Sequence, residues 1–504
     1  MKKINIFILF LLNICILNFV SGSTLHLSIS SNPSRLNPLL ATDSASGEIS
    51  SWIFDSLVEY DKDANIIPKL AKNWYFENNT TLIFKLKKNI KWSDGKPFDA
   101  DDVIFTYKLI TSPKIFTPYA DDFRYVKKIE KIDDFTIKII YKRPYFKALN
   151  IWMLPIVPKH ILQNQKNIMT SDFNKHPIGT GPYIIKNFEI NKDIVLYANK
   201  NYFIHKPYID KILYHFIPDP STNFLMLKTK KLDVGSLTPL QLTRQIDKNF
   251  KKYYKIYEKI SNGYTYLGFN LNNKKFKNPL IRKAISLAIN KKQLIDILFF
   301  SHAKICNGPF MPGTWAYNKN VKTTYNPKKA KEILNKLGFN EKHPLTFTIT
   351  TNSNNNLRVY AAQIIQYQLQ QIGVKVKIRT MEWQAFLNTV VMPRKFEAVI
   401  LGWGLSLTPD AYSIWHSNSI KKGGFNFIGY KNKEVDKLIK KAEITIDKKQ
   451  LSKYYKRIFE LIVKDHPYVF LYIPNSITAV NKKIKNVIPS IIGIMHNEID
   501  WIKP

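Results

Sequence analysis

Cysteine is almost absent from this chain of 504 residues, which contains two, Cys15 and Cys306. Cys15 lies in the apolar segment at the N-terminus, so cleavage of that segment would leave Cys306 with no intramolecular partner,. The sequence also has no Cys-x-x-Cys pair and no zinc-knuckle spacing. We therefore expect no disulfide framework and no zinc site, in a chain long enough for a large core and about two to four domains.

Motifs of the common enzyme classes are missing as well. The ten histidines are scattered, and there is no His-Glu-x-x-His, no Gly-x-Ser-x-Gly and no P-loop,. Gly179 and Gly181 do not form a dinucleotide fingerprint, because a strand-like run, 183–185, follows where a phosphate-binding helix is required,. We expect no enzyme, no cofactor and no metal. A pair of carboxylates facing each other in a cleft remains the remote enzymatic alternative.

Acidic residues are few relative to basic ones, 38 against 76, which gives a net charge of +38. Binding to nucleic acid or to an anionic membrane is one interpretation. The lysines are spread along the whole chain, and Asn and Ile, which share AT-rich codons with Lys, are also abundant. We favour compositional bias, with no nucleic-acid partner and with pairs such as Lys291-Lys292 on solvated helix faces,. The surface should still attract anions, an effect that salt screens.

Long apolar runs are absent except at the N-terminus. Two lysines precede the apolar run 4–20, and the small residues Ser21, Gly22 and Ser23 follow it, which is the order of a signal peptide,. The run is near the lower length limit for a membrane span and contains three asparagines, so cleavage is favoured over anchoring,.

A lipoprotein is the third alternative for this end of the chain. A lipid-modified cysteine normally follows a small residue, whereas Cys15 follows Asn13 and Ile14. We therefore predict that residues 1–22 are a cleaved signal peptide, that the mature protein begins near Ser23, and that it resides in the periplasm,.

The segment 82–107 predicts a strand, a turn and a capped helix. Leu82, Phe84 and Leu86 alternate as in a strand with one buried face,. Trp92-Ser93-Asp94-Gly95 predicts a turn, because glycine tolerates positive φ,. Asp99 is a good helix N-cap, and two further aspartates follow in the first turn,.

The same segment resembles the signature of the family 5 extracellular solute-binding proteins, the peptide- and nickel-type receptors of ABC importers. The matching residues are Leu86-Lys87, Trp92 to Gly95, and Ala100 to Val103. Three further blocks match along the chain: Leu36-Asn37-Pro38, Pro177 to Tyr183, and Leu267-Gly268-Phe269-Asn270. The resemblance extends over nearly the whole chain beyond the N-terminal segment, and it includes the oligopeptide- and dipeptide-binding proteins.

Other segments predict an α/β protein. A helix is expected near 48–59, and another begins at Pro279 with Leu280, Ala284, Leu287 and Ala288 on one face,. Strand 345–349, helix 357–372 and strand 374–378 form a βαβ unit, which predicts a parallel sheet,.

The resemblance implies a two-lobe periplasmic-binding-protein fold with hinge crossings and an inserted subdomain in the first lobe. It places lobe I at 23–59, 178–262 and 480–504, the insert at 60–177, and lobe II at 263–479. Two lobes joined by two crossings can close around a ligand like a jaw. The resemblance also implies a peptide or peptide-like ligand and permease subunits in the inner membrane as partners, and we expect a monomer.

The resemblance places the ligand on the loop 402–410, which would lend backbone groups to an extended ligand. Trp403 would line a side-chain pocket, and Trp383 matches a second pocket tryptophan. The full set of expected ligand-binding residues is Trp403, Gly404, Ser406, Trp383, Ser44, Ala45, Ser46 and Asp410.

Ser406 is a departure from the peptide-binding pattern, in which an aspartate at this position holds the α-ammonium group of the ligand. A neutral hydroxyl cannot offset a buried positive charge. Asp410 could substitute or could belong to a turn, and Arg358 and Arg394 do not align as anchors for a carboxylate. A receptor for a nickel chelate, haem or another non-peptide solute is therefore the alternative, with His416 as the histidine near the loop.

Overall fold

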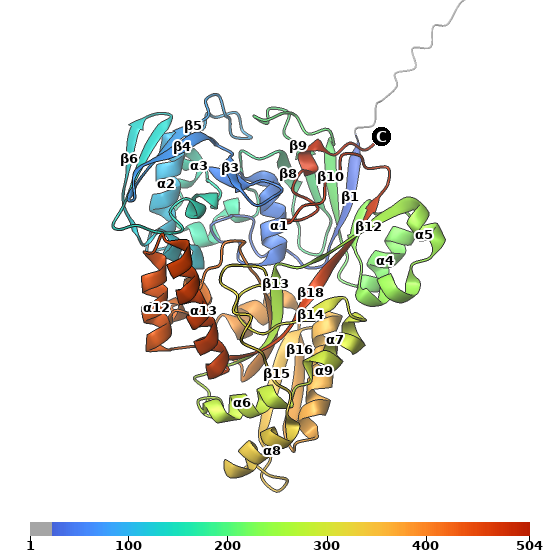
Figure 1. The fold of residues 1–504 in the computed structure, drawn as a ribbon. Helices are drawn as coiled ribbons and strands as arrows, with labels where there is room; N and C mark the ends of the chain where they lie inside the picture. The colour runs from blue at the N-terminus through green and yellow to red at the C-terminus, as the bar shows by residue number, and fades with distance from the viewer. Residues whose placement is uncertain (1–22) are drawn as a thin grey trace, which may run out of the picture.

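The computed structural model describes residues 23–504, so the predicted signal peptide and Cys15 lie outside the described residues. Two lobes are stacked in Figure 1, and the longest strand, β18 (Tyr468–Asn481), runs from one to the other. Its first half pairs with β13 and β14, and its second half pairs with β11 and β12. Strand β18 is therefore one connection between the lobes, and the turn between β12 and β13 is a second.

The upper lobe in Figure 1 contains two four-stranded sheets. In the first, the strand order is β1-β10-β9-β8, and β1 and β10 are parallel. The second is antiparallel, with the order β4-β5-β7-β6. The strands are β1 (Thr24–Ile29), β2 (Val58–Tyr60), β3 (Ile66–Pro68), β4 (Ala71–Asn78), β5 (Thr81–Leu86), β6 (Val126–Asp133), β7 (Thr136–Tyr141), β8 (Tyr183–Asn187), β9 (Ile194–Ala198) and β10 (Lys211–Phe216).

Short helices surround these sheets, and one hydrophobic core joins both of them. Trp52, Phe84, Trp92 and Tyr214 belong to this core. The helices are α1 (Ser44–Ile53), α2 (Ala100–Ile110), η1 (Pro118–Phe123), η2 (Asn150–Met153), α3 (Lys159–Leu162), η3 (Ile168–Thr170), η4 (Asp172–Asn174) and, near the C-terminus, η8 (Glu498–Asp500).

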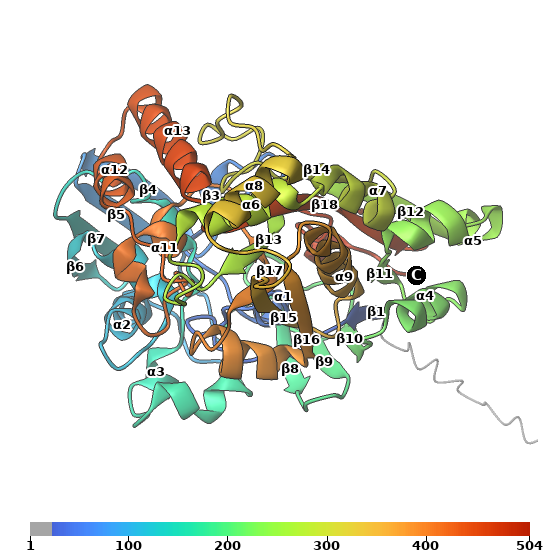
Figure 2. The same cartoon turned by 90° about the horizontal axis from the view of Figure 1, so that it is seen from below.

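A smaller unit lies at one end of the molecule, with its own core around Phe224 and Tyr254. Figure 2 shows its helices α4 and α5 at the end opposite α12 and α13. Its elements are α4 (Pro220–Lys228), β11 (Val234–Ser236), η5 (Gln241–Gln245), α5 (Lys248–Tyr253) and β12 (Tyr254–Ile260).

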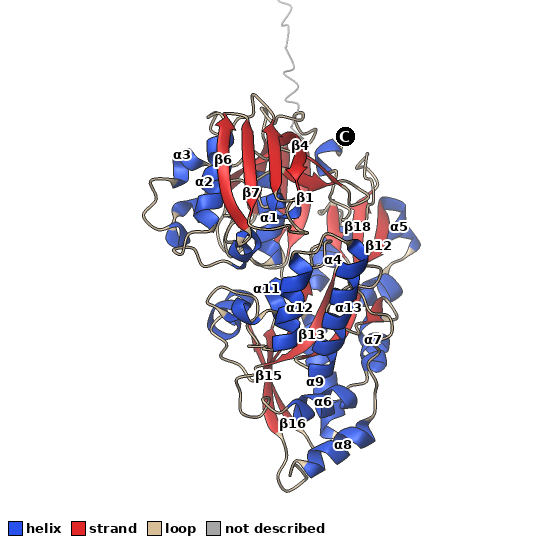
Figure 3. Cartoon of the chain, turned by 60° about the vertical axis from the view of Figure 1, so that its left-hand side comes forward, coloured by secondary structure: helices blue, strands red, loops and turns tan. Residues whose placement is uncertain are grey.

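The lower lobe is built on one mixed sheet with helices around it (Figure 3). Tyr266 and Leu267 are consecutive in β13, and they belong to separate cores, as expected from side chains that alternate across a strand,. The strands are β13 (Gly263–Phe269), β14 (Ala303–Ile305), β15 (Thr346–Asn352), β16 (Lys375–Met381) and β17 (Ala398–Gly404). The helices are α6 (Pro279–Ala288), α7 (Lys291–Phe299), α8 (Pro327–Lys336), α9 (Asn356–Gln370), α10 (Trp383–Phe386), η6 (Leu387–Val391), α11 (Tyr412–Trp415), η7 (Ser417–Ile420), α12 (Lys433–Glu443) and α13 (Lys448–Asp465).

The segment 82–107 folds as its sequence predicts. Strand β5 ends at Leu86, Gly95 has φ +88° in the turn, and α2 begins after Asp99. Asp99 accepts from the backbone of α2, while Asp102 accepts in return from the backbone N–H of Asp99, which makes a capping box,. The predicted residue boundaries of the lobes and the insert stay predictions.

Two local expectations were wrong. The helix expected at 48–59 is α1, which begins at Ser44 because Asp43 caps it and ends at Ile53, where Phe54 turns extended. Leu280 is 46% exposed, and Ile281 takes its place on the buried face of α6 with Ala284 and Ala288. The parallel pairing predicted from the βαβ unit is confirmed, since β15 pairs parallel with β16 and with β17, while β13 and β18 add antiparallel pairs to the same sheet.

Among residues 23–504, no helix combines the length and the apolar character that a membrane span needs.

Candidate ligand-binding site

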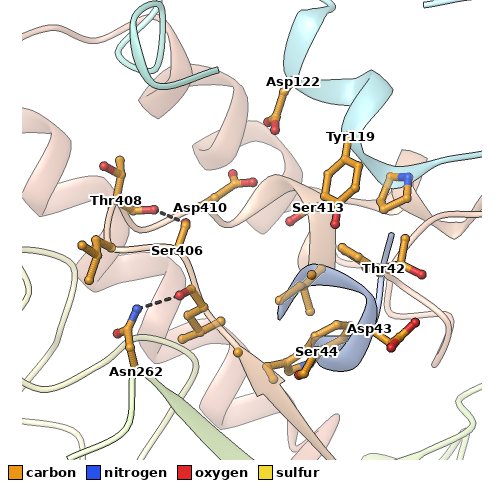
Figure 4. Close-up of a pocket in the computed structure, with 18 of the residues that line it drawn as sticks. Thr42, Asp43, Ser44, Tyr119, Asp122, Asn262, Ser406, Thr408, Asp410 and Ser413 are labelled. Carbon is orange, nitrogen blue, oxygen red and sulfur yellow. Dashed lines mark hydrogen bonds between the residues drawn. The ribbon is translucent and has the colours of Figure 1, made fainter. Parts of the chain in front are cut away.

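A cavity of about 510 Å³ lies between the two lobes. The upper lobe contributes the start of α1 with Thr42, Asp43 and Ser44, and η1 with Tyr119 and Asp122. The lower lobe contributes the end of β17 and the loop that follows it. Figure 4 shows these segments converging on one space from different parts of the sequence.

The end of β17 presents a backbone edge to this cavity. On one side, β17 pairs with β13 through Gly404, whereas β15, on the other side, pairs with β17 only at Ala398 and Val399. Leu405 N–H donates to the Asn262 carbonyl at 2.8 Å, so Leu405 and Trp403 direct their backbone groups toward β13,. Because this direction alternates along a strand, the N–H and C=O groups of Gly402 and Gly404 point toward the opposite edge.

Both glycines line the cavity, and neither has a side chain that would keep a ligand backbone away. A Cβ added at Gly404 would have no atom within 4 Å, whereas one at Gly402 would lie 2.9 Å from Arg358 Nη2. The geometry therefore offers an extended ligand a strand edge with which to pair.

The loop after β17 is held by its own polar contacts. The Asn262 side-chain amide donates to the Leu405 carbonyl at 2.6 Å, and Ser406 Oγ donates to the Thr408 carbonyl at 2.6 Å, as drawn in Figure 4. The hydroxyl proton of Ser406 is thus used within the loop. The oxygen lone pairs of this exposed serine remain available to accept a hydrogen bond,.

Aromatic side chains form an apolar wall of the cavity. The rings of Phe425 and Phe427 lie 5.2 Å and 5.4 Å from the ring of Trp403, measured between centroids. Trp403 Nε1 donates to the Tyr468 hydroxyl at 3.3 Å, which fixes the orientation of the indole. Trp383 begins α10 and also lines the cavity. Such a wall suits apolar side chains of a ligand.

Hydrogen bonds join the two lobes inside the cavity. Thr408 Oγ1, from the lower lobe, lies 3.0 Å from the Tyr60 hydroxyl and 3.0 Å from Asn150 Nδ2, both from the upper lobe. Asn150 Nδ2 also donates to the Tyr60 hydroxyl at 3.1 Å. These contacts hold the lobes in a closed arrangement.

A cluster of three charged groups lies beside this network. Lys147 Nζ is 2.5 Å from Asp122 Oδ1 in the upper lobe and 3.2 Å from Asp410 Oδ2 in the lower lobe. The lysine is 7% exposed, so its charge depends on these carboxylates. The cluster holds two carboxylates and one ammonium, which leaves an excess of negative charge next to the loop.

The pKa values of the cluster follow from this geometry. Burial alone would lower the pKa of Lys147, but Asp122 and Asp410 raise it well above its ordinary value. Burial would raise the pKa of Asp410, yet Lys147 and a backbone hydrogen bond from Tyr412 lower it. The pKa of Asp122 is raised, chiefly by burial and also by Asp410, against the effect of Lys147. Of the two aspartates, Asp410 is therefore the one whose ionised form is better stabilised.

The expected ligand-binding residues divide into two groups. Six of them line the cavity: Trp403, Gly404, Ser406, Trp383, Ser44 and Asp410. Ala45 and Ser46 are buried in the first turn of α1, where Ser46 Oγ donates to Asp43 at 2.6 Å, and neither is among the described lining residues. Ligand contact by any of the eight stays a prediction.

Three other residues considered from the sequence are not among the residues that line this cavity. Arg358 donates to the Asn352 side chain at 3.0 Å, and Arg394 donates to the Ile420 carbonyl. His416 is buried against Tyr412, and burial lowers its pKa. Among residues 23–504, no group of three or more His, Cys, Asp and Glu side chains could hold a metal ion.

Sequence reasoning missed most of the polar residues that the upper lobe contributes, although it included Ser44. Tyr60, Tyr119, Asp122, Lys147 and Asn150 all come from the predicted insert or its border, which was given no part in the site. The one usable signal was Lys147, a single cation in the apolar run from Tyr145 to Met153. A buried lysine requires a carboxylate partner, but the sequence does not say which.

Comparisons with known proteins agree on one family. The model of the bacterial extracellular solute-binding proteins, family 5 Middle, matches residues 65–425. The oligopeptide-binding protein AppA of Bacillus subtilis is 32% identical over 486 residues, which cover 92% of this chain and 88% of AppA.

Solved structures show the same similarity in three dimensions. The structure of Bacillus subtilis AppA in complex with a nonapeptide has a TM-score of 0.90 at 31% identity, covering 96% of this chain and 99% of that one. NikZ from Campylobacter jejuni in complex with Ni(L-His) has a TM-score of 0.86 at 28% identity, covering 95% and 99%. The predicted α/β fold with two lobes is confirmed.

Proposed function

Because this chain belongs to the bacterial extracellular solute-binding proteins of family 5, we propose that it is the substrate-binding receptor of an ABC importer for peptides. It captures a peptide or peptide-like solute between its lobes and delivers it to permease subunits in the inner membrane. Family members are binding proteins, and the proposal includes no enzymatic activity for this chain.

The observation that carries the proposal is the backbone edge at Gly402 and Gly404. An extended peptide that pairs with this edge adds a strand to β17, which gives affinity for any sequence of side chains,. Such a mode suits a receptor for peptides, because the hydrogen bonds come from the main chain that all peptides share.

The side chains of the cavity would then orient the peptide. Trp403 and Trp383 pack against ligand side chains, while the excess negative charge of Asp122 and Asp410 receives the amino terminus. This assignment gives Ser406 a minor part. It also explains how a peptide receptor can function without an aspartate at that position.

The receptor acts outside the cytoplasmic membrane in this proposal, as a monomer in the periplasm after cleavage of residues 1–22. N-terminal sequencing of the exported protein should find a start near Ser23. An intact Met1 in the membrane fraction, or a lipid on Cys15, would contradict this part of the proposal.

A nickel chelate is the second candidate ligand, supported by the similarity to Campylobacter jejuni NikZ in complex with Ni(L-His). A chelate that carries its own histidine ligands requires no metal cluster in the protein. The aromatic wall and the carboxylates of the cavity would then contact the histidine ligand.

Mass spectrometry of the small molecules released when the purified protein is denatured distinguishes these candidates. The proposal expects peptides, and titration calorimetry of ligand-free protein should give heat with short peptides. Binding of Ni(L-His) without any binding of peptides would overturn the peptide assignment, and the chain would still belong to family 5.

A further inference from the structure

A second cavity, of about 1150 Å³, lies between the lobes beside the first. The upper lobe contributes residues around α2 and the segment 162–169, and the lower lobe contributes residues around α10, η6 and Gly423. Thr42, Pro118, Leu387 and Met392 line both cavities, so the two spaces meet at these four residues. A ligand in the first cavity that extends past these four residues would enter the second.

The two cavities differ in charge. The first is lined by the carboxylates of Asp43, Asp122 and Asp410 and by one cation, Lys147. The second is lined by four cations, Arg35, Lys114, Lys166 and Lys422, and its described lining residues include no carboxylate. An acidic cavity is unexpected in a chain with a net charge of +38, so the contrast does not follow from composition alone.

The cations of the second cavity are available to a ligand. Within the described part of the chain, none of the four has a carboxylate within salt-bridge distance. Lys114, Lys166 and Lys422 are exposed, and Lys422 Nζ lies 4.5 Å from the centroid of the Phe116 ring. Amide side chains line the same cavity, including Gln163, Gln165, Asn167 and Asn388. These amides can bond a peptide backbone, and the cations can bond carboxylates.

We propose that the second cavity receives the distal, carboxylate-bearing part of a longer peptide whose amino-terminal part occupies the first cavity. The substrate class is then peptides that are too long for the first cavity alone, with acidic residues toward the carboxyl end. This inference rests on the proposed peptide function and adds the ligand's length, direction and charge to it.

The test compares three peptides by titration calorimetry with ligand-free wild-type protein at low salt. One is an octapeptide that ends in three glutamates, the second has three lysines there, and the third is a tripeptide with the same first residues. The acidic octapeptide should bind roughly tenfold or more tightly than the basic one. The difference should shrink at high salt, because salt screens exposed charges.

A triple variant, Lys114→Glu, Lys166→Glu and Lys422→Glu, should lose or reverse this preference and keep its affinity for the tripeptide. The matched control is Lys248→Glu, Lys251→Glu and Lys252→Glu on α5, which changes net charge equally at exposed residues that line neither cavity. The control should behave as the wild type does. Melting temperature verifies that both variants fold.

The inference is overturned if the acidic octapeptide has no advantage over the basic one, or if the control loses the preference as fully as the cavity variant. Both results would still leave tripeptide binding intact, and with it the proposed function. If no peptide binds the wild-type protein, the proposed function itself fails.

Discussion

Replacing Trp403 by alanine should weaken peptide binding far more than replacing Ser406 by alanine. The indole lines the cavity, packs edge-to-face against Phe425 and at a tilt against Phe427, and is held by its bond to the Tyr468 hydroxyl. Truncation of such an aromatic anchor costs about 2–4 kcal/mol of binding free energy. That range corresponds to a roughly 30-fold to 1000-fold rise in the dissociation constant.

Ser406→Ala removes one hydroxyl that donates to the Thr408 carbonyl. The loss of one ordinary hydrogen bond is about 0.5–1.5 kcal/mol, and here it acts on the loop more than on the ligand. The dissociation constant should therefore rise by less than about tenfold. Trp403→Phe is the matched control for Trp403→Ala, because phenylalanine keeps an aromatic ring while it loses the bond to Tyr468 and part of the packing area of the indole.

Titration calorimetry of the three variants with one peptide measures these differences, after thermal melting has verified the fold. Trp403→Ala should also lower the free energy of unfolding by about 2 kcal/mol, below the value for a fully buried tryptophan because the ring is only partly buried,. The reasoning is refuted if Ser406→Ala abolishes binding while Trp403→Ala binds normally. A polar anchor at Ser406 would then replace the aromatic one.

Two further predictions concern pH and lobe closure. Burial raises the pKa of Asp102 to about 6, above its unfolded value of about 3.9, so its contribution to stability is complete below pH ~4 and is lost as pH rises through ~6,. Urea unfolding of the wild type, compared with Asp102→Asn, should show this decline in the wild type, by about 3 kcal/mol; equal pH profiles for both proteins would disprove it. Arg124, in the upper lobe, pairs with buried Glu443 of α12, so Arg124→Ala should destabilise the closed form by about 3–5 kcal/mol and give a larger scattering radius with peptide present,. Lys138→Ala is the control, because it breaks a pair with Glu77 inside one sheet, and it should leave the scattering radius unchanged. If the radius of Arg124→Ala is also unchanged, the pair of Arg124 with Glu443 does not hold the lobes together.

Local elements were predictable where neighbouring residues determine them. The strand, turn and capped helix at 82–107 depend on alternation, on Gly95 and on Asp99, all within one short segment. The buried face of α6 was predicted one position off, with Leu280 in place of Ile281. Both residues are apolar and adjacent in the first turn, so the sequence alone does not say which of them faces the core.

The polar part of the site could not be predicted in the same way. Thr408 contacts Tyr60 and Asn150, and Lys147 contacts Asp410, across more than two hundred residues of sequence. Such contacts form only when two separately folded lobes close on each other. The residues of the lower lobe, and Ser44 of the upper lobe, were found because this chain resembles a known family. No motif in the sequence marked Tyr60, Lys147 or Asn150.

Hydrogen exchange at Gly402 and Gly404 tests most directly whether a peptide pairs with the edge of β17. The amides of both glycines should exchange rapidly without ligand and slowly when a peptide is bound, because β15 pairs with β17 only at Ala398 and Val399 and leaves this edge for the ligand. The amides of Trp403 and Leu405, which face β13, are the internal control and should be protected in both states. If the exchange of Gly402 and Gly404 stays unchanged while calorimetry shows that the peptide is bound, the peptide does not extend the sheet, and the central claim is contradicted.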